Sequence, residues 1–349
     1  MGRLFSVLPL FSADYSSAAS AVRDCGGLAV ICCPSGCMGN YVRFDEPRWA
    51  DMPGNVLQLE IQEMDTIFGD KDWSVLFDDL KEAHTAEFIG LVLTPVPALV
   101  GFDSDSICRR IRNGTGTPAV TVRTDGYRTY HDGLDKVMDA MFSIIPDGER
   151  EGGIAVLGFT PLEYTEDELR YLKETVGGKA CFPGDALSSL SRIRSAERNI
   201  LISSSAVPFA RMMEREYGIP YTFYAQGEHT DGNGDRRILI IGEQVRSNII
   251  RQWIRRSDSD ADVATFFTLD ERFSGSGDVR LNSEDDVRSL AERGYECVIG
   301  DPLIRPLFPD DAVFIPDPHA AVSSRLFWND RVDIRDIRSL AERAVSTLR

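Results

Sequence analysis

Three cysteines near the start of the chain have the type and spacing of a metal site. Cys32 and Cys33 are adjacent, and Cys37 follows after Pro-Ser-Gly. The apolar run 27–31 before them predicts a buried strand, and ligands of open α/β sheets collect at the carboxyl ends of strands. Because thiolates bind soft metals and iron–sulfur clusters, this loop predicts a metal or redox site. The alternative is that small, buried cysteines simply fill the end of the strand.

Other sequence motifs with a specific chemistry are absent. The chain has no Gly-rich Walker sequence, no G-x-G-x-x-G and no His-Glu-x-x-His, so nucleotide binding by this chain alone is disfavoured. Its four histidines, His84, His131, His229 and His319, limit His-rich metal sites. No Ser/His/Asp triad can be assigned from their spacing.

Short apolar runs that alternate with helical patterns predict the elements that position the cysteines. This alternation is typical of βαβ units, so we expect an α/β fold with mainly parallel sheets. The predicted strands are Leu28–Ile31, Val56–Ile61, Phe88–Leu93, Ala119–Val122, Ile154–Phe159, Ile200–Ser203, Tyr221–Tyr224, Ile238–Ile241, Val263–Phe267, Val298–Ile299 and Val313–Ile315.

A short sequence pattern occurs twice and predicts a repeated unit. Gly-Thr-Pro at 116–118 and Gly-Ile-Pro at 218–220 each come directly before a predicted strand. Glycine commonly ends a helix, and proline favours an extended segment. We therefore expect the same Rossmann-like half-unit in two places. The stretches 134–142 and 245–254 have the periodicity of amphipathic helices that pack on such sheets.

Two polar, glycine-rich stretches, 147–153 and 227–235, predict breaks between lobes. They divide the chain into three expected Rossmann-like lobes and a C-terminal helix. The predicted units are 1–147 with the cysteine loop, 153–226, 236–330 and the helix in 331–349.

The composition excludes several classes of partner. A net charge of −17, from 55 acidic and 38 basic residues, repels nucleic acid and anionic membranes. The longest apolar runs are too short for a transmembrane helix. Seven irregularly spaced cysteines fit a reducing compartment, so we expect a cytoplasmic protein in which Cys108, Cys181 and Cys297 are buried thiols.

Four segments in order resemble the nitrogenase component 1 superfamily, which also includes dark-operative protochlorophyllide reductase subunits and a reductive cyclase of nickel-tetrapyrrole synthesis. Residues 33–37, Cys-Pro-Ser-Gly-Cys, resemble the family's Gly-Pro-x-Gly-Cys loop. Residues 60–70 resemble its Glu-x-x-x-Val-Phe-Gly segment, and 94–103 its Cys-Pro-x-x-Leu-Ile-Gly-Asp-Asp loop. Residues 211–220 resemble the second-lobe helix and the Gly-Ile-Pro that follows it.

The resemblance implies three Rossmann-like lobes and an iron–sulfur cluster of the [4Fe–4S] type near the strand ends of the first lobe. Cys37 matches a family ligand of that cluster. The resemblance also implies a dimer, formed with a second copy or a related second subunit, and electrons from an iron-protein-like ATPase. The context would be anaerobic.

This chain departs from the family at other ligand positions. Thr94 occupies a position where the family commonly has a ligand cysteine, and Ser12, Asp14 and Tyr15 lie near another such position. A symmetric dimer would assemble four ligands from Cys37 and one further residue per chain. Cys33 is the first choice for that residue, and Cys32 or Asp14 are the alternatives. Asp14 would otherwise be a helix N-cap.

The second lobe has Ser203 where nitrogenase has its cofactor thiolate, and His319 falls roughly where nitrogenase has its cofactor histidine. A molybdenum–iron cofactor is therefore not expected, and His319 is either a pocket residue or a hydrogen-bonded loop residue. The resemblance thus implies proton donors, substrate-pocket residues and cluster ligands. The proton donors would be Asp14, Tyr15 and His319. The substrate-pocket residues would be Ser12, Asn40, Thr94 and Ser203, and the cluster ligands would be Cys37, Cys33 and Cys32.

The first functional expectation is an oxidoreductase component that passes electrons from an ATP-dependent iron protein, through an iron–sulfur cluster, to an organic substrate. The alternative is a non-catalytic scaffold or assembly protein for a metal cluster or cofactor, which the missing cysteines at positions 94 and 203 support. A third possibility is a clusterless small-molecule binding protein, which would be colourless even without oxygen.

Overall fold

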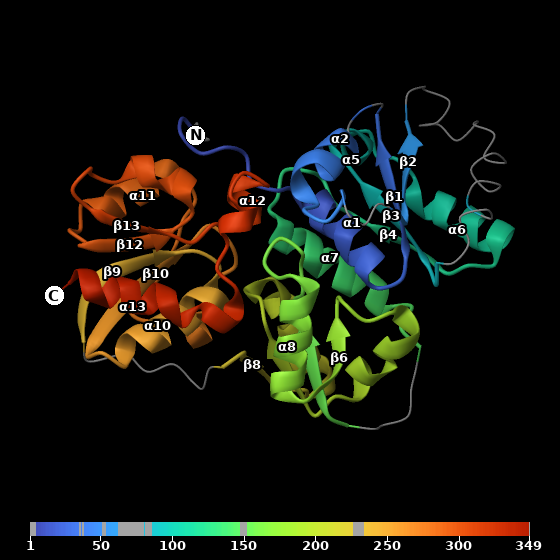
Figure 1. Ribbon diagram of the computed structural model, residues 1–349. Helices are drawn as coiled ribbons and strands as arrows, with labels where there is room; N and C mark the ends of the chain where they lie inside the picture. The colour runs from blue at the N-terminus through green and yellow to red at the C-terminus, as the bar shows by residue number, and fades with distance from the viewer. Residues whose placement is uncertain are drawn as a thin grey trace.

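The computed structural model describes residues 5–34, 36, 38–50, 54–61, 80, 86–146, 152–225 and 234–348. Three lobes are visible, each built on a parallel sheet with helices packed around it (Figure 1). The predicted α/β fold of three Rossmann-like lobes with mainly parallel sheets is therefore confirmed. The breaks predicted at 147–153 and 227–235 lie largely outside the described residues.

The first lobe carries a four-stranded sheet with the order β2-β1-β3-β4. Its strands are β1 (Leu28–Cys33), β2 (Val56–Glu60), β3 (Ile89–Leu93) and β4 (Ala119–Val122). Its helices are α1 (Asp14–Asp24), α2 (Met38–Asn40), α5 (Pro95–Leu99), α6 (Ser104–Thr115) and α7 (Tyr130–Phe142), with a π-helical turn at Tyr41–Asp45.

The second lobe repeats this arrangement with the order β6-β5-β7-β8. Its strands are β5 (Ile154–Leu157), β6 (Gly178–Phe182), β7 (Arg198–Leu201) and β8 (Tyr221–Phe223). Its helices are α8 (Glu166–Val176) and α9 (Val207–Tyr217), with 3₁₀ segments at Leu187–Ser195 and Ser204–Ala206.

The third lobe has five strands in the order β11-β10-β9-β12-β13. They are β9 (Asp235–Ile241), β10 (Ser259–Thr265), β11 (Val279–Arg280), β12 (Cys297–Gly300) and β13 (Val313–Pro316). The helices are α10 (Gln244–Arg255), α11 (Glu284–Ala291), α12 (Ala320–Ser323) and α13 (Arg338–Thr347). The C-terminal helix α13 packs on α10 and β12.

Two helices end as the repeated Gly-x-Pro pattern predicts. Helix α6 stops at Gly116 and α9 at Gly218, with φ angles of 77° and 69°. Glycine adopts this left-handed conformation without the steric cost of a Cβ. Strands β4 and β8 then begin at Ala119 and Tyr221.

The sequence pattern misses strands β6 and β11, which lie at the edges of their sheets. Strand β6 begins with Gly178 and Lys179, and β11 has only two residues. An edge strand is paired on one side only, and short or polar edge strands are common in natural sheets. Neither segment therefore carries the apolar run that marks an internal strand.

One buried apolar cluster continues through all three lobes and includes Val22, Phe209 and Ile254. Helices α1 and α7 approach so closely that a Cβ atom at Gly133 would lie 2.0 Å from the Asp14 carbonyl oxygen. The buried positions of Cys108, Cys181 and Cys297 are confirmed. Among the described residues, no helix has the length and apolar character needed to cross a membrane.

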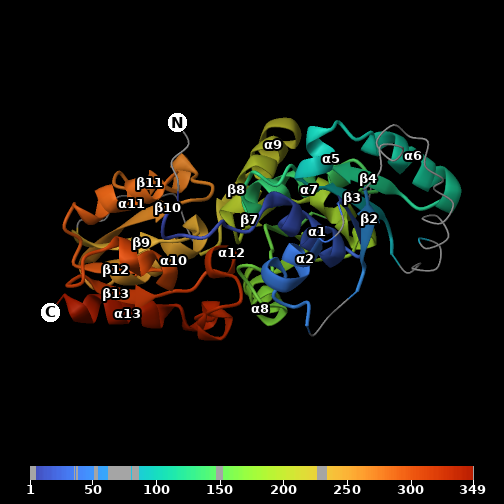
Figure 2. The same ribbon diagram turned by 90° about the horizontal axis from the view of Figure 1, so that it is seen from above.

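Residues 5–13, here called the N-terminal strap, cross from the third lobe to the first (Figure 2). The Glu284 carboxylate on α11 accepts hydrogen bonds of 2.7–2.8 Å from the backbone amides of Ser6, Val7 and Leu8. At the other end of the strap, the Ser12 amide donates to the Ala321 carbonyl of the third lobe over 2.8 Å, and the Ser12 hydroxyl donates to Asp45 of the first lobe over 2.9 Å. The strap therefore belongs structurally to both lobes.

Candidate functional site

The strand order of each of the three sheets reverses at one place. The reversals lie between β1 and β3, between β5 and β7, and between β9 and β12. Ligands of open parallel sheets bind in the crevice outside the carboxyl ends of strands at such reversals. The loops that follow these six strands are therefore the places to look for a site.

The reversal in the first lobe brings the cysteine loop next to Thr94. The Thr94 hydroxyl donates to the Cys32 carbonyl over 2.8 Å and so ties the end of β3 to β1. Ser35 and Cys37 lie outside the described residues, and the structure does not place the predicted ligand Cys37. The chain then continues through α2 into the π-helical turn, a feature that is frequent at functional sites.

The predicted ligands Cys32 and Cys33 are both completely buried in β1. Consecutive side chains of a strand point to opposite faces, and these two belong to different apolar clusters on the two sides of the sheet. Burial raises the pKa of the Cys32 thiol, which disfavours the thiolate. The two thiols therefore do not converge, and the described residues contain no group of three or more His, Cys, Asp or Glu side chains placed to hold a metal.

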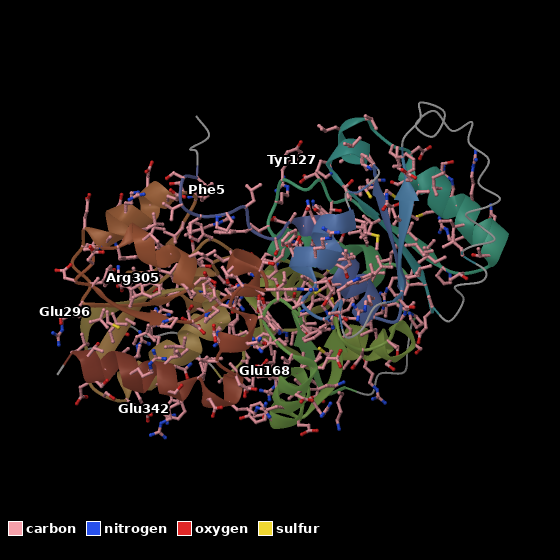
Figure 3. The ribbon with its side chains drawn as sticks, turned by 45° about the horizontal axis from the view of Figure 1, so that its top comes forward. Phe5, Tyr127, Glu168, Glu296, Arg305 and Glu342 are labelled. Atoms are coloured by element: carbon pink, nitrogen blue, oxygen red, sulfur yellow. The ribbon has the colours of Figure 1, made fainter. Side chains whose placement is uncertain are left out.

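A cavity of about 790 Å³ opens between the first lobe, the third lobe and the N-terminal strap. Three predicted site residues, Tyr15, Asn40 and Thr94, lie on its first-lobe wall. Phe5 lies on the third-lobe side of this region and Tyr127 on the first-lobe side (Figure 3). The full lining is Phe5, Pro9, Leu10, Phe11, Ala13, Tyr15, Asn40, Phe44, Asp45, Thr94, Pro95, Gly126, Tyr127, Arg128, Thr129, Phe266, Arg280, Leu281 and Asn282.

Asp14 and Ser12 lie behind the cavity wall and hold it in place. The buried Asp14 carboxylate accepts from the amides of Asp125 and Gly126 and pairs with Lys136 at 2.9 Å. It therefore fixes the loop that carries Tyr127, Arg128 and Thr129 to the cavity. Asp14 is the first helical residue and not the N-cap, which is Ala13.

Ser12 fixes another part of the same wall, since its hydroxyl donates to Asp45 over 2.9 Å. The Ser16 hydroxyl donates to the second oxygen of Asp45 over 2.6 Å. Burial raises the pKa of Asp45 although both hydroxyls act to lower it. These contacts position the end of the π-helical turn.

Glu163 and Ser203 follow the reversal strands β5 and β7 of the second lobe, and they meet three side chains from the other two lobes in one buried cluster. The Tyr130 hydroxyl donates to Glu163 Oε1 over 2.5 Å, and the Ser203 hydroxyl donates to the same oxygen over 3.0 Å. His131 Nε2 and His319 Nε2 lie 2.9 and 3.2 Å from the Tyr130 oxygen. The predicted residues Ser203 and His319 are thus brought together, linked through Tyr130 and Glu163.

Backbone amides fix the tautomers of both histidines in this cluster. The Thr268 amide donates to His131 Nδ1 over 3.2 Å, and the Ala321 amide donates to His319 Nδ1 over 3.1 Å. Each neutral ring therefore carries its proton on Nε2 and donates to the Tyr130 oxygen. Burial lowers the pKa of His131 to about 4 and that of His319 to about 3. Both rings are neutral at pH 7.

Glu163 is held as the neutral acid at the centre of the cluster. Its Oε2 atom is buried and has no hydrogen-bond partner in the described part of the chain. Burial raises the pKa of Glu163 to about 8, although the hydrogen bonds from Tyr130 and Ser203 act to lower it. An ionised carboxylate with an unpaired buried oxygen is costly, so the proton stays on Glu163 at neutral pH.

The cluster fills the junction between the lobes. Phe267 stacks on His131 and His319 with ring centroids 5.0 and 5.1 Å away. The cavity beside His319 measures only about 10 Å³. A cofactor enclosed between Ser203 and His319 would therefore have to displace Tyr130 or Glu163.

Sequence reasoning missed Tyr130, His131 and Glu163. The available signal was that Glu163 follows β5 and Tyr130 follows β4, both at carboxyl ends of strands. A glutamate six residues beyond a strand is ordinary, however, and only the packing of the lobes shows that these side chains meet.

The chain shares features with known proteins. The family model described as nitrogenase component 1 type oxidoreductase matches residues 16–226. The chain is 26% identical over 176 residues to the nitrogenase iron-molybdenum cofactor biosynthesis protein NifE of Rhizobium meliloti (strain 1021), covering 46% of this chain and 37% of that protein. It is also 26% identical over 219 residues to NifE of Clostridium pasteurianum, covering 59% of this chain and 47% of that protein. The matched regions thus span less than half of either relative.

Solved structures share the fold along nearly the whole chain. The structure titled "Nitrogenase Cp1 at pH 6.5" matches with a TM-score of 0.72 at 12% identity, covering 99% of this chain and 94% of that chain. "Nitrogenase Cp1 at pH 5" matches with a TM-score of 0.66 at 15% identity, covering 99% and 90%. At these identities the likeness concerns the fold alone.

Proposed function

Because this chain belongs to the nitrogenase component 1 type oxidoreductase family, we propose that it is a scaffold or assembly protein that receives a metal cluster or cofactor precursor as cargo. The relatives described as cofactor biosynthesis proteins support this alternative better than the reductase expected first. The cargo enters and leaves, so it is a substrate of the protein and not a resident cofactor.

One observation carries the proposal: the hydrogen-bonded cluster closes the junction at the positions that correspond to the cofactor ligands of nitrogenase. Ser203 lacks a thiol, and its hydroxyl is already engaged with Glu163. His319 donates to Tyr130 through Nε2, and its other ring nitrogen accepts from Ala321. Neither side chain is available to a metal without breaking this cluster. An enclosed catalytic cofactor is therefore disfavoured.

The cysteine-loop end of the first lobe is the proposed place for the cargo. The loop leads directly into Asn40 and Phe44, which line the open cavity, and Thr94 lies on the same wall. Cys37 is the proposed thiolate ligand. Since Cys32 and Cys33 do not converge, further ligands would come from a second copy or a related subunit. A [4Fe–4S]-type cargo, such an oligomer and a cytoplasmic location are parts of this proposal.

Anaerobic loading tests this function. The purified chain is incubated with ferrous iron and sulfide, desalted, and analysed for iron, sulfide and visible absorption. We expect a whole-number stoichiometry that is lost in Cys37→Ser. Cys108→Ser is the matched control, because Cys108 is buried on α6 and hydrogen-bonded to Thr121, away from the cavity, and it should load like the wild type.

The fate of the bound cluster separates cargo from cofactor. A scaffold should release its iron readily to bathophenanthroline disulfonate, a ferrous chelator, under conditions in which the protein stays folded. Failure of the wild type to load, or equal loading of Cys37→Ser, would overturn the proposal. A cluster that resists the chelator and cycles with dithionite would instead support the reductase.

A further inference from the structure

Two arginines line the cavity beneath the strap in a chain whose net charge is −17. The side chain of Arg280, on the short edge strand β11, is exposed, and no hydrogen bond or ion pair joins it to another described side chain. Arg128 reaches the cavity from the first lobe, and its contacts with Asp125 and Asp132 are loose, at 3.4 and 3.9 Å. Two guanidinium groups from different lobes therefore border one cavity.

The acidic group in the lining makes no ion pair with either arginine. Asp45 is the carboxylate among the lining residues, and its two oxygens accept hydrogen bonds from Ser12 and Ser16. The amides of Asn40 and Asn282 add further hydrogen-bonding groups to the same walls. The polar part of the cavity is thus suited to an acceptor-rich, negatively charged group, and guanidinium forks match the geometry of such groups.

The remaining walls are largely aromatic. Six rings line the cavity: Phe5, Phe11, Tyr15, Phe44, Tyr127 and Phe266. Phe11 and Phe266 pack edge to face with ring centroids 5.1 Å apart. Phe44 and Tyr127 are 56% and 73% exposed. Large exposed rings that line a cavity mark a binding surface for an apolar body more often than a free surface.

We propose that this cavity binds an organic anion with a flat, apolar body, whose acidic group is held between Arg280 and Arg128 and whose body packs on the aromatic walls. The strap supplies Phe5 and Phe11, so it forms one side of the site. The inference goes beyond the proposed function, since it holds whether or not a metal cargo binds nearby.

A fluorescent probe of this chemistry tests the site in the metal-free, full-length protein. Anilinonaphthalene sulfonate has an apolar two-ring body and one negative charge, and its emission rises in apolar surroundings. We expect saturable binding that is roughly tenfold weaker in Arg280→Met, which removes a charge-assisted contact. Arg280→Lys should recover part of the affinity. Arg110→Met, at an exposed position on α6, is the matched control and should bind like the wild type.

Two further measurements separate acid recognition from simple apolar adsorption. Phenylnaphthylamine, the uncharged analogue, should bind to the wild type more weakly than the sulfonate does. Its affinity should be the same for Arg280→Met as for the wild type. Phe44→Ala, at a half-exposed position, should weaken both probes while the protein stays folded. Equal affinity of wild type and Arg280→Met for the sulfonate, or unchanged binding of both probes by Phe44→Ala, would overturn the proposal. Because no metal is present, neither result bears on cluster loading.

Discussion

Replacing Glu163 by glutamine is expected to make the protein more stable at neutral and alkaline pH. The glutamine side chain would keep an oxygen to accept from Tyr130 and Ser203, and it cannot ionise. In the wild type, burial raises the pKa of Glu163 from 4.5 to about 8, so the folded state holds a proton that the unfolded chain releases. The stability of the wild type must therefore fall as pH rises through this interval.

The size of the effect follows from the same values. Each pH unit between the unfolded and folded pKa is worth about 1.36 kcal/mol. Below pH 4.5 Glu163 does not make the free energy of unfolding depend on pH. Relative to that limit, the raised pKa of Glu163 lowers the free energy of unfolding by about 3 kcal/mol at pH 7 and by about 5 kcal/mol above pH 8. Glu163→Gln should remove this dependence, so its advantage over the wild type grows with pH.

Urea unfolding, followed by tryptophan fluorescence at several pH values from 5 to 9, measures the difference. A matched control is Glu168→Gln on α8, because the ion pair with Arg331 helps to hold the pKa of Glu168 below its ordinary value and its loss should destabilise across the whole range. The infrared carbonyl band of a protonated carboxyl group at pH 7 should disappear in Glu163→Gln. A constant stability difference from pH 5 to 9, with no such band, would refute the assignment of a proton to Glu163.

Three other predictions follow from the structure. His319→Asn should reduce acid denaturation, because burial lowers the pKa of His319 from 6.5 to about 3 and the wild type therefore loses stability as pH falls below 6.5; urea unfolding at pH 4 to 7 measures this. Glu284→Gln should loosen the strap, since an ionised carboxylate with a pKa lowered to about 2 holds three backbone amides. We expect faster amide hydrogen exchange at residues 6–8 in this variant, and unchanged exchange would contradict the prediction. Gly133→Ala should cost roughly 3 kcal/mol or more, because its Cβ would meet the Asp14 carbonyl at 2.0 Å; a thermal midpoint equal to that of the wild type would show that α1 and α7 separate freely.

Local sequence patterns were sufficient for the fold class and for most of the strands. The apolar runs predicted β4 at its observed bounds, and the Gly-x-Pro pattern predicted where α6 and α9 end. Such features depend on neighbouring residues, because a buried parallel strand needs a continuous apolar run and a left-handed C-cap favours glycine. The four motif segments were likewise local, and they were enough to identify the family.

The arrangement of the candidate sites required the tertiary structure. The sequence by itself determined that Ser203 and His319 follow strand ends, but only the packing of the three lobes brought them to Tyr130 and Glu163, which fill the space between them. The sequence also determined that Cys32 and Cys33 are adjacent, but the pleat of β1 turns their side chains to opposite faces of the sheet. The cavity beneath the strap likewise depends on Glu284, which is 278 residues away from Ser6 along the chain. Hydrophobic periodicity reports which side of an element is buried, whereas the partner that buries it is decided by contacts between distant segments.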